Sequence, residues 1–440
     1  MAELNAKDVV FEASSVVDPV GRVFHLDGRL FRAITPPHAD FVRHTIHLAA
    51  QQRWFDHGLV RTWLSDYTLP GYPLVIEHQR VPFVTLRGEW SGEGLRCAAL
   101  CMLRVSSALM HSHVCLKDAH PWNVLFDGTT PCFIDWGSIR PAGELHWAFW
   151  YAQFRQYVLA PLYLFSIGEH RIARAMLREH RVGVGNEIVG LPSTRELPEL
   201  PRRIAESAGS APTPETFEAL ASYVADVEFP HVEGEWSSYA QPGLGNVDNL
   251  EPLREKDRVV HRILGADPGD SLIDIGTNNG LHSEIGAALG KRVLACDIEE
   301  SCLNALFLRT RHSGLDILPL YHDVLWPIGS SGIFNSIPSA EERLRCDTAL
   351  VMALVHHLVF KQHVSFEALA KGIRDYARKR AVVEFVPADD QHVALWSPER
   401  FPWYTLENFL AAMQPHFDRY TIIPSEPSPR SVIVFEGAKD

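Results

Sequence analysis

The sequence predicts an α/β protein in two parts, with a doubly wound, mostly parallel sheet in its C-terminal half and an α+β domain before it. Three observations predict this arrangement. An apolar strand runs into a glycine-containing turn over residues 271–280, a second apolar strand ends in an acid at Asp297, and strands alternate with helical segments from there onward. At 440 residues the chain is long enough for two or three domains, each with its own hydrophobic core.

The C-terminal elements follow one another at the spacing of strand–helix–strand units. A helix is expected over residues 247–264, where it leads into the first strand. Apolar runs then predict strands over residues 272–274, 292–296, 315–320, 347–355 and 381–386.

The turn after the first strand has the pattern Asp-x-Gly-x-x-x-Gly, which begins at Asp274. Its glycines, Gly276 and Gly280, let the backbone approach a ligand closely, and Asp297 can accept hydrogen bonds from both hydroxyls of a ribose. A dinucleotide site seats a pyrophosphate on a helix N-terminus, and an acid in the turn would repel it. The acid suits a cationic, amine-bearing ligand instead.

This motif resembles the first motif of the class I S-adenosylmethionine-dependent methyltransferases, whose ligand carries a sulfonium and an α-amino group. The resemblance covers residues 250–437 and implies a Rossmann-like methyltransferase domain with S-adenosyl-L-methionine as its cofactor. It also implies that an acid after the third strand, Asp323, approaches the adenine amino group. The cofactor-binding residues that it implies are Asp274, Gly276, Thr277, Asn278, Gly280, Asp297, Ile298, Asp323 and Val324.

Candidates for the methyl-transfer step lie after the fourth and fifth strands, on the edge where open α/β sheets bind ligands. His356 and His357 could supply a general base, which is needed if the acceptor is a hydroxyl or an ammonium. Alternatively, one of them packs and the other caps the next helix. Glu384 is a weaker candidate, because a carboxylate on a buried strand needs a partner. Aromatic residues that could line the ligand sites, or simply pack, are Tyr239, Trp396, Trp403 and Tyr404.

In the N-terminal half, residues 23–34 predict a β-hairpin that turns at Asp27-Gly28, and a helix follows over residues 39–57. A further pair of strands and a long amphipathic helix are predicted over residues 74–77, 82–86 and 94–110.

A second motif follows this helix, with the spacing Asp-x-x-x-x-Asn and then an apolar-flanked Asp-x-Gly. It resembles the catalytic and metal-binding loops of the protein-kinase-like and aminoglycoside-phosphotransferase-like fold. The resemblance implies Asp118 as the catalytic base. It implies Asn123 and Asp135 as ligands of Mg²⁺ ions that hold the phosphates of ATP.

The phosphate-holding parts of that fold are weak in this sequence. No Gly-x-Gly-x-x-Gly loop precedes the hairpin turn, and the strand offers Arg32 where a lysine would pair with the phosphates. The helix over residues 39–57 contains no glutamate to anchor such a cation. We therefore expect a degenerate kinase-like domain, although Asp118, Asn123 and Asp135 argue for some ligand chemistry.

Composition limits the partners and the compartment. The net charge of −13 argues against broad nucleic-acid binding, although a local basic patch stays possible. The seven cysteines show no Cys-x-x-Cys pairing and no zinc spacing, as in a reducing cytoplasm. The sequence begins without a signal peptide, and its longest apolar stretch, residues 157–167, is too short to span a bilayer. A cytoplasmic protein is expected.

These observations predict a kinase-like domain over residues 1–180, a Gly- and Pro-rich linker with connecting helices over 181–246, and a methyltransferase domain over 247–440. The whole arrangement resembles bacterial fusions of kinase-like and methyltransferase domains associated with nodulation and surface-polysaccharide modification. The predicted function is S-adenosylmethionine-dependent methylation of a small molecule or saccharide, with the first domain holding the acceptor or a nucleotide. The alternatives are a bifunctional enzyme that phosphorylates and then methylates its acceptor, and a binding protein without activity. The acceptor and the oligomeric state are left open.

Overall fold

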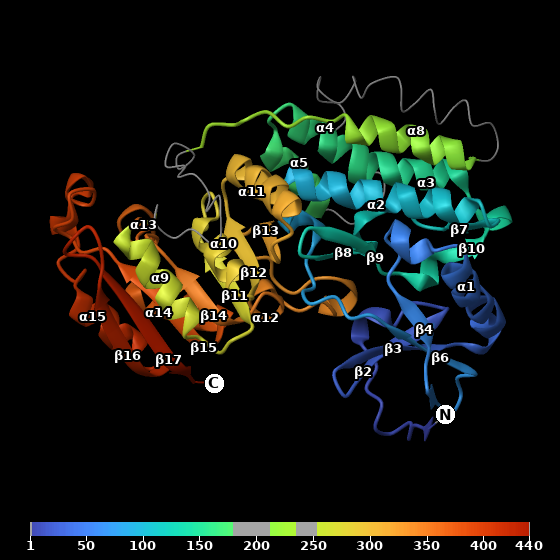
Figure 1. Ribbon diagram of the computed structural model, residues 1–440, viewed down its shortest axis with the longest axis horizontal. Coiled ribbons are helices and arrows are strands. Elements are labelled where there is room, and N and C mark those ends of the chain that lie inside the picture. Colours follow the sequence, from blue (N-terminus) through green and yellow to red (C-terminus); the bar gives the residue numbers. More distant parts are fainter. Residues whose placement is uncertain (1, 179–211, 235–252, 440) are drawn as a thin grey trace. The chain divides into compact units, whose positions relative to one another are not determined.

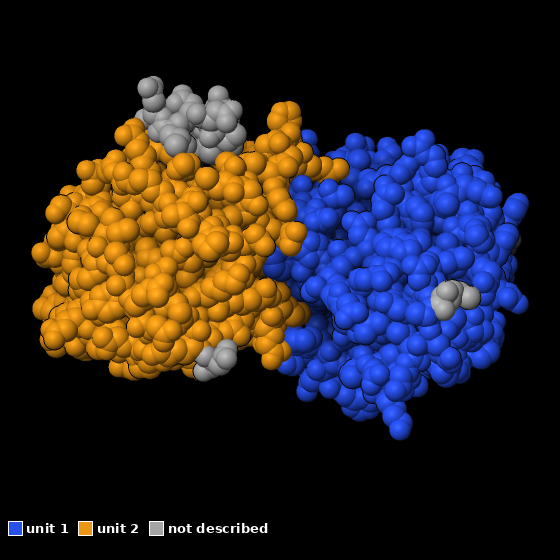
Figure 2. Space-filling model, turned by 60° about the horizontal axis from the view of Figure 1, so that its bottom comes forward, with its two compact units in different colours: residues 1–231, 330–338 blue, residues 232–329, 339–440 orange. Residues whose placement is uncertain are grey.

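The computed structural model describes residues 2–178, 212–234 and 253–439, which fold into two compact units (Figures 1 and 2). Unit 1 comprises Met1–His231 and Ser330–Pro338, and unit 2 comprises Val232–Gly329 and Ser339–Asp440. Most of the predicted linker, together with Tyr239, lies outside the described residues.

Unit 1 is built on a four-stranded antiparallel sheet in the order β2-β3-β6-β4. The hairpin turn uses Asp27 and Gly28, both with positive φ (51° and 75°), as a two-residue turn between twisted strands requires. The hairpin prediction is therefore confirmed. The strands are β2 (Gly21–Leu26), β3 (Arg29–Ile34), β4 (Thr62–Leu64) and β6 (Leu74–His78).

The prediction of a strand over residues 82–86 is wrong, because this segment is irregular. Both edges of β6 are already taken, by β3 and by β4, so no edge remains for another strand. Pro82 also lacks the N–H that a ladder would need.

Helix α2 (Gly92–Met110) is buried over nearly its whole length, and its first turn is capped by Ser91, whose Oγ accepts the N–H of Gly94. It packs against α8 (Pro214–Ala225), a helix of the predicted linker, and against β9. Helix α1 (Ala39–Gln51) is shorter than expected, because Arg53 adopts φ 56° and a 3₁₀ turn follows it. The remaining elements of unit 1 include β7 (Val114–Leu116), β8 (Val124–Asp127), β9 (Thr130–Phe133), β10 (Ile139–Pro141), α3 (Trp147–Phe154), α4 (Ala160–Ser166) and α5 (His170–Arg178).

Unit 2 contains a seven-stranded sheet in the order β13-β12-β11-β14-β15-β17-β16. The first five strands in this order are parallel, whereas β17 runs antiparallel to both of its neighbours. The order reverses between β11 and β14, and open sheets bind ligands at such a switch point. The strands are β11 (Ser271–Ile275), β12 (Arg292–Asp297), β13 (Ile317–Tyr321), β14 (Cys346–Val351), β15 (Ala377–Phe385), β16 (Phe417–Pro424) and β17 (Ser431–Ala438).

The five predicted C-terminal strands are thus present, and the boundaries of the fourth and fifth differ most from the prediction. The fourth strand stops at Val351, because Val355 already belongs to helix α13 (Val355–Gln362). The fifth begins at Ala377, where the charged run Arg378–Arg380 hides it from a hydrophobicity pattern.

Helices cover both faces of this sheet (Figure 1). One face forms an aliphatic core with α9 (Glu255–Gly265), α10 (Leu281–Ala288) and α11 (Glu300–Ser313). The other packs Phe385 and Phe435 against aromatic residues of α14 (Phe366–Tyr376) and α15 (Leu406–Met413). A short helix, α12 (Ala340–Arg343), lies before β14. In the described part of the chain, no helix combines the length and the apolar character that a membrane span requires.

Candidate functional site

The turn after β11 has the backbone of a close-approach loop. Gly276, Asn278 and Gly280 all have positive φ, at 79°, 51° and 88°. The N–H groups of Gly276 and Thr277 both donate to the carbonyl of Cys296, at 2.8 and 3.0 Å, which ties the turn to the end of β12. A side chain at Gly280 would collide with Leu306 of α11. These contacts explain why the turn needs its glycines.

Asp274 lies beneath this turn and is only 1% exposed. Its Oδ2 accepts hydrogen bonds from the Thr277 and Ser283 hydroxyls, at 2.8 and 2.7 Å. Burial raises the pKa of Asp274 above its usual value. The carboxylate therefore holds the turn onto the start of α10, and a direct contact with a ligand stays a prediction.

Asp297 closes the turn from the end of β12. Its Oδ2 accepts the N–H of Asn278 at 2.6 Å, and its Oδ1 accepts those of Ile298 and Glu299 at 2.7 and 3.0 Å. Burial nevertheless raises the pKa of Asp297 to about 6. A carboxylate offers about four accepting positions, so a further donor can still bind to Oδ2. The next residue, Ile298, is 45% exposed beside this buried acid.

The next strand brings Asp323 and Val324 to the same edge of the sheet, since β12 and β13 are parallel neighbours. Both side chains are half-buried, and Oδ1 of Asp323 accepts the N–H of Leu325 at 3.0 Å. The predicted cofactor residues thus meet at the carboxyl ends of three adjacent strands.

Asn279, which the sequence analysis did not single out, also belongs to this turn. Its side-chain Nδ2 is buried and has no hydrogen-bond partner among the described residues. A buried donor without a partner is costly unless a ligand or water satisfies it. Its place between Asn278 and Gly280 was the only signal in the sequence. A carboxylate with an open accepting position and an unpartnered amide donor fit a ribose and an amino-acid moiety.

His356 and His357 lie in the first turn of α13, just after β14. Their rings are 4.2 Å apart, and the His356 ring stacks on Trp396 at 5.6 Å with an interplanar angle of 12°. His356 is 4% exposed, and burial, followed by the nearby His357 and Arg430, lowers its pKa to about 2. The imidazole is therefore neutral near pH 7. A base this weak is better suited to hydrogen bonding with the methyl acceptor than to taking up a proton from it.

Glu384 has the partner that a buried carboxylate requires. Its Oε2 lies 2.9 Å from Nζ of Lys256, at the start of α9, whereas its buried Oε1 has no hydrogen bond among the described residues. Arg430, in the segment before β17, approaches Oε1 to 3.9 Å and binds both oxygens of Asp390, at 2.7 and 3.1 Å. No sequence pattern indicated Lys256, Asp390 and Arg430, because they come from segments far apart in the chain.

Tyr404 and Trp396, two of the aromatic residues after β15, both contact other residues of unit 2. Tyr404 is 3% exposed, and its hydroxyl donates to the carbonyl of Val386 at 2.8 Å, so it packs in the core. Trp396 is half-buried against the two histidines.

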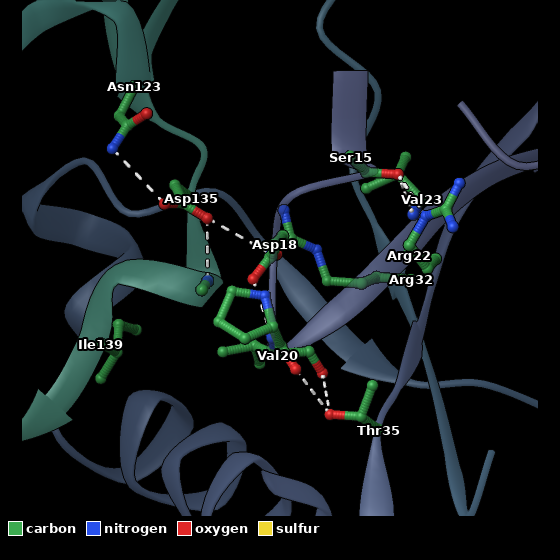
Figure 3. Close-up of polar contacts among 12 residues, drawn as sticks. Ser15, Asp18, Val20, Arg22, Val23, Arg32, Thr35, Asn123, Asp135 and Ile139 are labelled. Carbon is green, nitrogen blue, oxygen red and sulfur yellow. Dashed lines mark hydrogen bonds and ion pairs between the residues drawn. The ribbon is translucent and has the colours of Figure 1, made fainter. Parts of the chain in front are cut away.

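In unit 1, the structure brings Asn123 and Asp135 together (Figure 3). Nδ2 of Asn123 lies 3.4 Å from Oδ2 of Asp135. The side chain of Asp118 pairs with Lys117 at 3.3 Å, and its backbone N–H donates to Oγ of Ser138 at 3.2 Å. The two loops of the second motif are therefore anchored to each other.

The donor set around Asp135 does not fit an ATP-bound Mg²⁺ ion. Nη1 of Arg32 lies 3.3 Å from Oδ1 of Asp135, and the N–H of Gly137 donates to the same oxygen at 2.9 Å. A guanidinium beside this carboxylate would repel a divalent cation. Within the described residues, no three His, Cys, Asp or Glu side chains come together as a metal site.

Comparisons with known proteins found a similar sequence and several similar structures. No family model matches it. It is 27% identical to the nodulation protein NoeA of Rhizobium meliloti (strain 1021) over 442 residues, which cover 91% of this chain and 90% of that protein.

Solved structures similar to the chain include methyltransferases. The bifunctional kinase-methyltransferase WbdD is 16% identical, with a TM-score of 0.30, over 49% of this chain and 46% of its own, so the chain spans less than half of WbdD. The N-methyltransferase NodS from Bradyrhizobium japonicum WM9 is 12% identical, with a TM-score of 0.32, over 42% of this chain and 96% of its own.

Proposed function

We propose that unit 2 is an S-adenosylmethionine-dependent methyltransferase that acts on a small-molecule or saccharide acceptor. One observation carries the proposal. At the glycine turn after β11, which borders the switch point of the sheet, the buried Asp297 at the end of the adjacent strand β12 accepts the N–H of Asn278 and keeps an accepting position on Oδ2, while Ile298 beside it is exposed. An acid and an apolar side chain in this order match the ribose and the base of a nucleoside.

The remaining residues of this edge have consistent roles. The turn over residues 276–280 provides a close backbone approach, and Asn279 offers a buried donor. Asp323 would accept a hydrogen bond from the adenine amino group, and Ile298 and Val324 would pack against the adenine ring. An acidic side chain at Asp274 suits a cationic ligand better than a pyrophosphate. When bound, S-adenosylmethionine would supply an electrophilic methyl group, and positioning of the acceptor would then provide much of the catalysis.

The acceptor would be held at the ends of β14 and β15. Two buried polar atoms there make no hydrogen bond among the described residues, Nδ1 of His356 and Oε1 of Glu384, which Arg430 approaches to 3.9 Å. Either can bind an O–H or N–H group of an acceptor, which supports a polyhydroxylated or amine-bearing molecule.

For unit 1 we propose a binding role, for the acceptor or for a nucleotide, without phosphoryl transfer. The contact between Arg32 and Asp135 argues against the alternative of a bifunctional enzyme. The alignment with NoeA covers both units, which supports a single function shared by the two.

Isothermal titration of the full-length chain with S-adenosylmethionine tests the proposal. We expect one site in unit 2, with affinity reduced about tenfold or more by Asp297→Asn, since two charge-assisted hydrogen bonds would weaken. The matched control is Asp316→Asn, which removes an exposed acid paired with Arg292 at 3.5 Å, before β13 begins. The absence of binding to the unaltered protein, or equal losses in both variants, would refute the proposal.

A further inference from the structure

We propose that Arg32 is the resident cation of the Asp135 site in unit 1, where it takes the place of a divalent metal ion. Ligand binding at this site would then require no metal ion. This inference goes beyond methyl transfer and does not depend on it.

Two carboxylates contact one nitrogen of the Arg32 guanidinium (Figure 3). Arg32 lies on β3 and is 8% exposed. Its Nη1 is 2.7 Å from Oδ2 of Asp18 and 3.3 Å from Oδ1 of Asp135. These three residues come from the segment before β2, from β3 and from the segment after β9, so the ion cluster joins distant parts of the chain.

Asp18 supplies the anchor that helix α1 lacks. Its other oxygen, Oδ1, accepts the N–H of Val20 at 2.9 Å, so its orientation is fixed by its own loop. A cation on this strand would otherwise need a helix glutamate to hold it, and α1 contains none. Asp18 thus holds the same nitrogen of Arg32 that contacts Asp135.

Gly137 of the Asp-x-Gly motif is needed for the same cluster. A Cβ atom at this position would lie 2.8 Å from Oδ2 of Asp18, 2.9 Å from Oδ1 of Asp135 and 3.0 Å from Nη1 of Arg32. The glycine of a motif that would hold a metal therefore leaves space for the contacts of Arg32 with Asp18 and Asp135.

Three donors contact the oxygens of Asp135. Oδ1 faces Arg32 and the N–H of Gly137, and Oδ2 faces Nδ2 of Asn123. An Mg²⁺ or Mn²⁺ ion needs these oxygens at about 2.1 Å and would lie next to the guanidinium. The cluster must lose its cation before a metal can enter.

Mn²⁺ binding to the full-length chain, followed by electron paramagnetic resonance, tests this inference with the metal alone as the probe. We expect no Asp135-dependent Mn²⁺ site in the unaltered protein. Arg32→Met should create a site that binds Mn²⁺ at least about tenfold more tightly, and adding Asp135→Asn should abolish it. The control is Arg22→Met, which removes a cation from the neighbouring strand β2, where the guanidinium lies over Phe11.

Two results would overturn the inference. One is a Mn²⁺ site in the unaltered protein that Asp135→Asn removes. The other is a folded Arg32→Met variant, with unchanged circular dichroism, that gains no Mn²⁺ affinity. If Arg32→Met fails to fold, Mn²⁺ binding to the unaltered protein and to Arg32→Lys still tests the inference. Both keep a cation at position 32, so an Asp135-dependent Mn²⁺ site in either would overturn it.

Discussion

The backbone N–H of Asn278 donates to Oδ2 of Asp297 over 2.6 Å and thereby ties the glycine turn after β11 to the end of β12. This carboxylate is buried, and its pKa is raised to about 6 even though three N–H groups oppose the shift. The turn thus depends on a group that changes charge just below neutral pH. The charge of Asp297 should therefore control ligand binding.

We expect the affinity for S-adenosylmethionine to rise as the pH passes through about 6, the pKa of Asp297, and to level off above about pH 7. Hydroxyl donors bind the carboxylate form, and at about pH 5 only about one tenth of the protein carries it, so affinity should be about tenfold lower than at about pH 7. Titration calorimetry at the two pH values measures the ratio. In Asp297→Asn, affinity should be low and independent of pH over this range. An unchanged pH dependence in that variant would assign the effect to another group.

Gly280→Ala should destabilise unit 2 more than a glycine substitution of equal backbone strain. Gly280 and Gly314 both have positive φ, at 88° and 72°, but only at Gly280 does a side chain meet Leu306; nothing lies within 4 Å at Gly314. We expect about 1 kcal/mol of destabilisation for Gly314→Ala and about 2–4 kcal/mol for Gly280→Ala, from strain plus overpacking. Urea unfolding followed by circular dichroism measures both. Equal losses would show that the contact with Leu306 relaxes freely.

The parts of unit 2 that could be predicted from sequence are those encoded by neighbouring residues. Each of the strands β11 to β13 is an apolar run followed at once by the polar residues of its loop, so Asp297 and Asp323 were predictable together with their strands. The pairing of Lys256 with Glu384 joins residues 128 positions apart, and no local pattern encodes it.

In unit 1, too, features of neighbouring residues could be predicted and contacts between distant residues could not. Arg32 and the absence of a glutamate in α1 were visible in the sequence, and they indicated a changed phosphate site. Its partner Asp18 lies in an irregular segment without periodicity, so the contact between the two could not be predicted. The strand expected over residues 82–86 failed because local hydrophobicity does not show that both edges of β6 are taken.

Lys256→Met should strongly destabilise unit 2, because it leaves the fully buried Glu384 without its closest counter-ion. We expect a loss of about 3–5 kcal/mol, and recovery of much of it in the double variant Lys256→Met/Glu384→Leu. The control is Lys371→Met, which breaks an exposed pair with Asp375 at 2.6 Å on α14 and should cost less than about 1 kcal/mol. If the double variant is no more stable than Lys256→Met, the uncompensated charge of Glu384 is not the cause.

His356 should make unit 2 sensitive to mild acid. Burial keeps its imidazole neutral in the folded protein, with a pKa of about 2, whereas the unfolded chain takes up a proton near pH 6.5. A lowered pKa in the folded state means that stability is lost as the pH falls through the unfolded value. Between about pH 7 and about pH 5, this single group should remove about 2 kcal/mol. Urea unfolding at both pH values should therefore show a smaller acid loss in His356→Gln than in the unaltered protein, by about that amount. His363→Asn, an exposed change at the end of the same helix, should keep the full loss. Equal acid losses in His356→Gln and the unaltered protein would mean that His356 takes up its proton in the folded state, and would make it available as a base.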